Sequence, residues 1–189
     1  YIASLNIEHA YYDLAGEYEP FEGICFADTL DLAEAQQLSL FAEENTERVQ
    51  RQKNVEITVI IGNPPYNVGQ MNENDNNKNR KYHNIGLRVR ETYGKDSKAT
   101  NQHALGDPYV KFFRWASDRL QGRDGIVCYV SNNSFVDQMA FDGMRKHLQQ
   151  DFQRIYVINL RGDIRKDSMR DGIPLGEKHT IFGLAAMVG

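Results

Sequence analysis

The stretch that decides the fold is Val59-Ile60-Ile61-Gly62-Asn63-Pro64-Pro65-Tyr66 (VIIGNPPY), where an apolar run ends abruptly in a polar, rigid and aromatic corner. A continuous apolar, β-branched run such as residues 57–61 is typical of a central parallel strand that is buried on both faces. Two successive prolines remove two backbone donors and fix φ, so the corner after this strand is rigid. We therefore expect Asn63 and the Pro64 carbonyl to be held there as hydrogen-bond acceptors.

Such a corner suits a planar group that carries an exocyclic amine. Two fixed acceptors can take both N–H groups of the amine, and the ring of Tyr66 offers a flat face for stacking. An aromatic amine such as adenine N6 is a poor nucleophile, because its lone pair is delocalised into the ring. Hydrogen bonds from both N–H groups favour a pyramidal nitrogen as bond formation begins, which stabilises the transition state of methyl transfer. Asn-Pro-Pro could also be a plain turn, but the preceding strand and the following tyrosine favour the functional interpretation.

The elements around this corner alternate between strand and helix. Hydrophobic periodicity predicts helices over residues 1–15, 32–54, 108–120 and 134–150, and strands over residues 23–27, 57–61, 125–131, 154–160 and 180–188. This order predicts an α/β fold with an open, mostly parallel, doubly wound sheet. Ligands bind at the carboxyl ends of the strands in such sheets. Three of these strands are followed there by polar residues, namely Asp28, Asn63 and Ser131-Asn132-Asn133.

Residues 67–106 interrupt this order with a long polar insert that is first Asn-rich and then basic. A structureless segment of this length is uncommon in a compact domain and is usually a functional lid or a disordered stretch. Basic residues with interleaved tyrosines suit contact with DNA phosphates and bases. The basic residues in question are Lys78, Arg80, Lys81, Arg88, Arg90, Lys95 and Lys98. A solvated loop whose charges face only water is the alternative.

The composition narrows the class of protein. The 189 residues suit one domain, and a net charge of −4 means that any nucleic-acid binding needs a local basic patch. Cys25 and Cys128 lie in apolar stretches, which predicts buried free thiols and a reducing compartment. No apolar run approaches the roughly 18 residues of a membrane span, and the histidines show no metal-ligand spacing. The first residues read as a helix already under way and the last as an unfinished strand, so we expect a piece of a longer polypeptide.

VIIGNPPY resembles the catalytic motif of S-adenosylmethionine-dependent amino-methyltransferases, especially the DNA adenine-N6 class. The similarity covers nearly the whole chain, because YIASLNIEHAYYDL, ICFADTLDL, DPYVKFFRWASDRL, GIVCYVSNNSFVD and IYVINLRGDIR resemble, in that order, the methyltransferase region of single-chain restriction–modification enzymes (Type ISP and Type IIG-like). The resemblance implies a Rossmann-like class I methyltransferase fold, with residues 1–189 forming part of one catalytic domain. In such a fold the first two strands and the Gly-rich donor loop are expected before residue 1.

The resemblance also implies roles for individual residues. Asn63, Pro64, Pro65 and Tyr66 would be catalytic. Asp28, Thr29, Leu30 and Asn63 would hold S-adenosylmethionine. Tyr66 and Phe182 would contact the flipped adenine, although core packing is an equal alternative for Phe182. Arg88 and Arg90 would contact the DNA.

The expected reaction is methyl transfer to the N6 amine of a flipped adenine in double-stranded DNA, without a metal, in the cytoplasm of a prokaryote. Target-recognition, motor and nuclease domains would belong to the same polypeptide, and we expect the 189 residues alone to bind the donor poorly. Two alternatives stay open. The same tetrapeptide occurs in enzymes that methylate a protein glutamine amide or an rRNA base amine, and the isolated piece could be a non-catalytic DNA-binding or scaffolding element.

Overall fold

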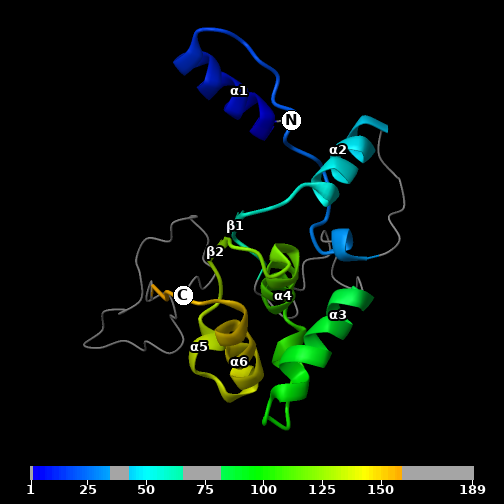
Figure 1. Ribbon diagram of the computed structural model, residues 1–189, viewed down its shortest axis with the longest axis vertical. Coiled ribbons are helices and arrows are strands. Elements are labelled where there is room, and N and C mark those ends of the chain that lie inside the picture. Colours follow the sequence, from blue (N-terminus) through cyan, green and yellow to red (C-terminus); the bar gives the residue numbers. More distant parts are fainter. Residues whose placement is uncertain (1, 35–42, 66–81, 159–189) are drawn as a thin grey trace, which may run out of the picture. The chain divides into compact units, whose positions relative to one another are not determined.

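The computed structural model describes residues 2–34, 43–65 and 82–158 (Figure 1). The chain divides into two compact units, residues 1–56 and residues 57–189. Each unit is described separately. Tyr66, the basic residues 78–81, Phe182 and the expected strand 180–188 lie outside the described residues.

The first unit contains two helices and a short 3₁₀ turn. Helix α1 (Ile2–Ala15) confirms the first predicted helix, but its apolar stripe is not buried, and Leu14 is 91% exposed. The 3₁₀ turn η1 (Asp31–Ala33) and α2 (Glu43–Asn54) lie within the second predicted helix. The predicted strand over residues 23–27 is wrong, since no strand is assigned there. A strand is defined by its ladder of hydrogen bonds, and this segment has none among the described residues.

Side chains of α2 hold the extended segment of this unit in place. Gln52 donates through Nε2 to the carbonyl of Gly23 at 2.8 Å. The Arg51 guanidinium pairs with Glu22 at 3.2 Å. These bonds satisfy backbone and charged groups that a sheet would otherwise have to satisfy.

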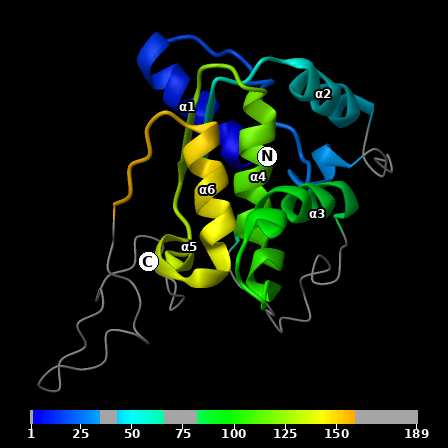
Figure 2. The same ribbon diagram turned by 60° about the horizontal axis from the view of Figure 1, so that its bottom comes forward.

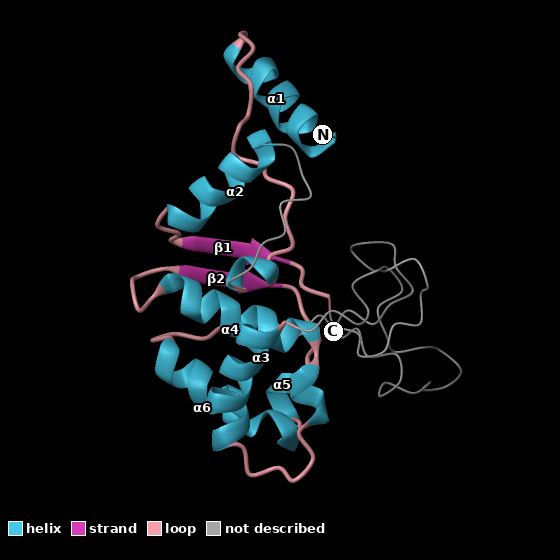
Figure 3. Cartoon of the chain, turned by 90° about the vertical axis from the view of Figure 1, so that its right-hand side faces the viewer, coloured by secondary structure: helices cyan, strands magenta, loops and turns pink. Residues whose placement is uncertain are grey.

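The second unit is built on two parallel strands, β1 (Val59–Gly62) and β2 (Ile126–Tyr129) (Figure 3). Their register pairs Val59 with Ile126 and Gly62 with Tyr129. The predicted strands and their parallel direction are therefore confirmed. Burial on both faces is wrong for the described residues, because Ile60 is 8% exposed whereas Ile61, on the opposite face, is 77% exposed. Cys128 is exposed on β2, so the prediction that both thiols are buried is wrong for it.

Helix α4 (Pro108–Leu120) covers the buried face of this sheet. It begins with Pro at the first helical position, as predicted, because the missing N–H costs nothing there. Ala116 and Leu120 pack with Ile60. Gly125 brings the turn before β2 against this helix, since a Cβ at that position would lie 2.6 Å from Leu120 Cδ2 and 2.8 Å from the Thr58 carbonyl.

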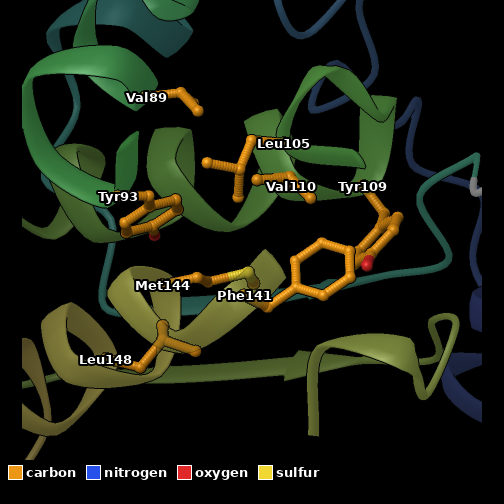
Figure 4. Packing of buried hydrophobic residues seen from close by; sticks show 8 residues of the cluster. All are labelled: Val89, Tyr93, Leu105, Tyr109, Val110, Phe141, Met144 and Leu148. Atoms are coloured by element: carbon orange, nitrogen blue, oxygen red, sulfur yellow. The ribbon is translucent and has the colours of Figure 1, made fainter. Parts of the chain in front are cut away.

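The expectation of a structureless insert is wrong for residues 82–106. These residues form α3 (His83–Val89), the π-helix η2 (Arg90–Gly94) and the 3₁₀ helix η3 (His103–Gly106). Apolar residues spaced at Ile85, Val89 and Tyr93 are all buried, which explains why a basic segment folds as helix here. A cluster of eight buried side chains results (Figure 4), comprising Val89, Tyr93, Leu105, Tyr109, Val110, Phe141, Met144 and Leu148.

The predicted helix over residues 134–150 is broken into α5 (Ser134–Asp137), the 3₁₀ turn η4 (Met139–Phe141) and α6 (Asp142–Asp151). The break lies at Gln138, which has an extended ψ of 142°. Arg145 of α6 donates through Nη1 to the carbonyls of Phe135 and Gln138, each at 2.8 Å. One guanidinium therefore satisfies carbonyls that a continuous helix would have bonded internally. The strand predicted over 154–160 is not assigned at residues 154–158, which are exposed.

A buried charge network joins the helices of this unit. Arg114 of α4 is 4% exposed and pairs with Asp118 at 3.0 Å and with Asp151 of α6 at 3.0 Å. Its guanidinium carbon also lies 5.4 Å from the ring centre of Tyr93. Figure 2 shows α6 running alongside α4, as the ion pair between them requires. The second unit is therefore an α/β structure with a two-stranded parallel sheet.

Candidate functional site

The Asn-Pro-Pro corner lies where β1 ends. β1 finishes at Gly62, and the carbonyl of Gly62 accepts a hydrogen bond from the N–H of Val130 at 3.1 Å. The two strands therefore stay side by side up to the residue that precedes Asn63. This pairing fixes the direction in which the chain enters the corner.

A tyrosine side chain lies directly against Gly62. A Cβ at this position would be 3.1 Å from Cε1 of Tyr129, tighter than ordinary van der Waals contact. Tyr129 is in turn held by Phe113 in an edge-to-face arrangement with ring centres 5.2 Å apart, and Phe113 packs on Phe135 at the same separation. The corner therefore follows a strand end that α4 and α5 support through three aromatic rings. Burial raises the pKa of the Tyr129 hydroxyl, so Tyr129 stays neutral.

The corner presents the side chain of Asn63 to solvent. Asn63 and Pro65 are exposed, whereas Pro64 is buried. Within the described residues, neither the Asn63 side chain nor the Pro64 carbonyl has a hydrogen bond. Fixed, unpaired acceptors on a rigid turn can receive two N–H bonds from an amine without first breaking bonds of their own.

The polar residues after β2 lie at the same edge of the sheet. Because β1 and β2 are parallel, their carboxyl ends meet, and Ser131 to Asn133 follow directly after Val130. Asn132 accepts the N–H of Ser134 on its side-chain oxygen at 2.7 Å, which forms the turn into α5. Ser131 is buried and donates to the Asn132 carbonyl at 3.3 Å. The structure therefore brings together two of the three polar strand ends that the sequence singled out.

Asp28, the third of these residues, belongs to the first unit. Its carboxylate accepts the N–H of Leu30 at 3.0 Å and so shapes the turn that leads into η1. Asp28 and Thr29 are half-buried, and Leu30 is buried. Asp28 therefore stands on a defined turn, where a carboxylate oxygen can still accept further bonds.

The two arginines expected to contact DNA differ in their surroundings. Arg88 forms a two-pronged ion pair with Asp118, through Nε at 3.0 Å and Nη2 at 2.8 Å. Arg90 is exposed, and its side chain has no hydrogen bond or ion pair among the described residues. Arg88 is thus committed to α4, whereas Arg90 is available to a ligand.

Comparisons with known proteins show the family of the chain. Residues 6–164 match the family model described as the Eco57I restriction-modification methylase. The chain belongs to this family. A search of curated proteins gives no match.

Three solved structures resemble the chain closely. One is the DrdV–DNA complex determined by cryoEM, at 49% identity and a TM-score of 0.72 over 80% of this chain. A second is a nuclease-deletion mutant of the Type ISP restriction–modification enzyme LlaGI with a DNA substrate mimic, at 44% identity and a TM-score of 0.78 over 87% of this chain. A third is the ATP-dependent Type ISP enzyme LlaBIII bound to DNA, at 40% identity and a TM-score of 0.77 over 87% of this chain.

The chain aligns with only a small part of each of these larger proteins. The aligned region covers 15% of DrdV, 14% of the LlaGI mutant and 11% of LlaBIII.

Among the described residues, no three or more His, Cys, Asp or Glu are arranged to hold a metal ion. Every helix in the described part of the chain falls short of the length and apolar character that crossing a bilayer requires.

Sequence reasoning named Arg90 but missed the polar residues that lie around it. Lys111 of α4 lines a hollow together with Arg90, His83 and His103. Burial lowers the pKa of Lys111, and the charge of Asp107 opposes that shift. The available signal was the spacing of Asp107 and Lys111, since residues four apart on a helix lie on the same face. Because the insert was expected to be structureless, no packed surface was expected opposite that face.

Proposed function

We propose that this chain is the amine-binding part of a DNA methyltransferase that transfers a methyl group from S-adenosylmethionine to adenine N6. The observation that carries the proposal is the proline-rich corner after β1, where the Asn63 side chain and the Pro64 carbonyl have no hydrogen-bond partner among the described residues. Membership of a restriction–modification methylase family and the DNA complexes of the structural relatives support it. A Rossmann-like class I fold, continuing beyond the two strands described, is part of the same proposal.

Each residue of the corner has a distinct task in this reaction. The side-chain oxygen of Asn63 and the carbonyl of Pro64 accept the two N–H bonds of the target amine and turn its lone pair toward the methyl group. Pro65 fixes the backbone, and Tyr66 stacks on the base after it has left the duplex. Both acceptors are neutral, so the corner orients the amine and removes no proton. As the new N–C bond formed, the methyl–sulfur bond of the donor would break and leave its electron pair on sulfur. The nitrogen would become cationic and would then release a proton to solvent.

The residues proposed to hold the donor are Asp28, Thr29, Leu30 and Asn63. The half-buried carboxylate of Asp28, fixed by its bond to the Leu30 N–H, is a suitable acceptor for an amino group. Because Leu30 is buried, it would shape the turn and would not pack on the donor directly. When bound, the donor supplies the electrophilic methyl group, so the chain need only bind and align the two reactants.

The same proposal places the chain in a larger restriction–modification polypeptide of the prokaryotic cytoplasm. Domains for target recognition, and a motor and a nuclease where present, would belong to that polypeptide. Double-stranded DNA would be the macromolecular substrate. Arg90 would contact its phosphates, and Arg88 would add to the local positive field unless it released Asp118.

Methyl transfer from labelled S-adenosylmethionine tests this proposal. The complete natural polypeptide that carries these residues is incubated with mixed-sequence duplex DNA, and the label is identified after hydrolysis. We expect N6-methyladenine, and a loss of about 100-fold or more in rate for Asn63→Ala, because one of two transition-state hydrogen bonds is removed.

Asn54→Ala is the matched control, since Asn54 is an exposed asparagine at the end of α2. Its rate should equal that of the wild type. Label on cytosine, on protein glutamine or on rRNA would replace adenine as the substrate. A folded protein that binds the donor and labels none of these would refute methyl transfer altogether.

A further inference from the structure

A hollow of about 780 Å³ lies on the helical side of the second unit, away from the strands. It is lined by α3, η2, η3 and by Lys111 of α4. Val89, Gly94 and Leu105 are buried at its floor, and His83, Arg90 and His103 are exposed at its rim. A defined floor with polar groups at the rim is typical of a binding site.

The charge of the lining is of one sign. Arg90 and Lys111 are cationic side chains, and no Asp or Glu of the described residues lines the hollow. Asp107 acts on Lys111 electrostatically, but no ion pair joins these two residues within the described part of the chain. The hollow therefore attracts an anion.

Neither of the two principal cations forms an ion pair with another described residue. The Arg90 side chain has no partner among the described residues, in contrast to Arg88, which Asp118 occupies with both oxygens. Lys111 is half-buried, with Nζ 5.7 Å from the ring centre of Tyr82, so it is partly removed from water without a carboxylate in contact. A bound anion would restore the favourable interactions that desolvation has removed.

The glycines of the lining keep the hollow open. A Cβ at Gly86 or at Gly106 would meet nothing within 4 Å, so both positions face open space. The volume exceeds that of a single phosphate group and leaves room for the sugar attached to it. A planar guanidinium and an ammonium are the two side-chain types that proteins use most for phosphate.

We propose that this hollow binds a backbone phosphate of the DNA strand, with Arg90 and Lys111 as the phosphate ligands and Tyr82 beside them. That the phosphate belongs to DNA rests on the proposed function, while the anion site rests on the lining alone. A phosphate contact carries no sequence information, so its task is to fix the position of the duplex relative to the enzyme. The residues at the rim would thereby hold DNA at a second point besides the amine corner.

The test measures DNA affinity by fluorescence anisotropy at several salt concentrations, with the complete natural polypeptide. Arg90→Gln should weaken binding about tenfold, equally for the target sequence and for mixed sequence, because one charged hydrogen-bonded contact is lost. The slope of log affinity against log salt should become less steep by about one unit for each cation removed, so Arg90→Gln combined with Lys111→Gln should change it by about two.

Gly86→Leu tests the hollow without removing any charge. Its side chain would enter open space and occupy the volume proposed for the sugar–phosphate, so we expect a similar loss of affinity with an unchanged circular dichroism spectrum. Arg154→Gln is the matched control, since Arg154 is an exposed arginine after α6 that does not line the hollow. It should change affinity less than twofold.

Equal losses for Arg90→Gln and Arg154→Gln would overturn the site in favour of general electrostatic attraction, as would unchanged affinity in Gly86→Leu. A third outcome combines two results: millimolar deoxyadenosine monophosphate competes for binding, and the variants leave the affinity for duplex DNA unchanged. It would assign the hollow to a free nucleotide instead. The proposed function fails separately. Variants that weaken DNA binding in an enzyme that methylates no DNA would leave the phosphate site standing, whereas methylation with unaltered KM for DNA in all variants would remove the site and keep the reaction.

Discussion

The sheet and the helical cluster of the second unit differ in how fully their side chains are buried. β1 and β2 bury one face against α4 and leave Ile61 and Cys128 exposed on the other. The helical cluster encloses its central side chains completely, since Tyr93, Tyr109, Phe141 and Met144 are at most 1% exposed (Figure 4). The proposed chemistry lies on the less enclosed element. We infer that the helices supply most of the stability and that the sheet end is held in position by packing on them.

The largest effect should come from crowding the helical cluster at Gly143. A Cβ there would overlap the carbonyl oxygen of Tyr93 and lie 2.8 Å from the backbone nitrogen of Ser97, so backbone and not a flexible side chain would have to move. We expect Gly143→Ala to lower the free energy of unfolding by about 3 kcal/mol or more. Urea denaturation followed by circular dichroism measures it.

Gly86→Ala is the control within the same cluster of helices. It adds the same methyl group to a helix where nothing lies within 4 Å, and the gain in helix propensity should raise stability by up to about 1 kcal/mol. Equal stability of the two variants would mean that α6 and η2 do not cross as closely as the structure shows.

The next effect compares the two faces of β1. Ile60 packs with Ala116 and Leu120, whereas Ile61 is 77% exposed. In this 189-residue chain, Ile60→Ala should cost about 2–3 kcal/mol, and Ile61→Ala should stay within about 0.5 kcal/mol. The same pair measured in the complete natural polypeptide sharpens the comparison. A cost at Ile61 that appears only there would show that another element covers the outer face of the sheet.

The difference between the two regions also explains which features could be predicted from sequence. Residues 57–61 and 125–131 are short β-branched runs, and the parallel pairing they imply is present. The Asn63 corner was identifiable because prolines and a side-chain amide dictate local chemistry wherever they stand. By contrast, residues 82–106 were expected to be unstructured because their basic composition hid the helical spacing of Ile85, Val89 and Tyr93.

Other differences depend on side-chain partners that hydrophobic periodicity does not reveal. The break at Gln138 is stabilised by Arg145, and no local signal between residues 134 and 150 announces that bond. The ion pair that occupies Arg88 depends on Asp118, thirty residues away. Composition alone could not separate Arg88 from Arg90, since both are basic residues of the same segment. The hollow around Arg90 likewise arises only once α3, η3 and α4 are packed together.

The smallest predicted effect concerns the ionisation of Asp107, the residue that immediately precedes α4. Burial raises the pKa of Asp107 to about 7, and its Oδ1 has no hydrogen bond among the described residues. An ordinary aspartate titrates near about 3.9. Because the folded pKa is raised, the stability linked to the protonated form is complete below about pH 4 and is lost as pH rises through about 7.

The side chain of asparagine cannot ionise, so Asp107→Asn should not lose stability as pH rises through about 7. We expect its melting temperature to match the wild type at pH 4.5 and to exceed it by about 2–4 °C at pH 8, a modest difference because Asp107 is partly exposed and solvent screens its charge. Asp124→Asn, at the exposed turn before β2, is the control for loss of a carboxylate. A constant offset between Asp107→Asn and the wild type at every pH would mean that Asp107 is already ionised in the fold. Lys111 would then have a charged neighbour at neutral pH, and a phosphate would have to compete with that carboxylate for the ammonium group.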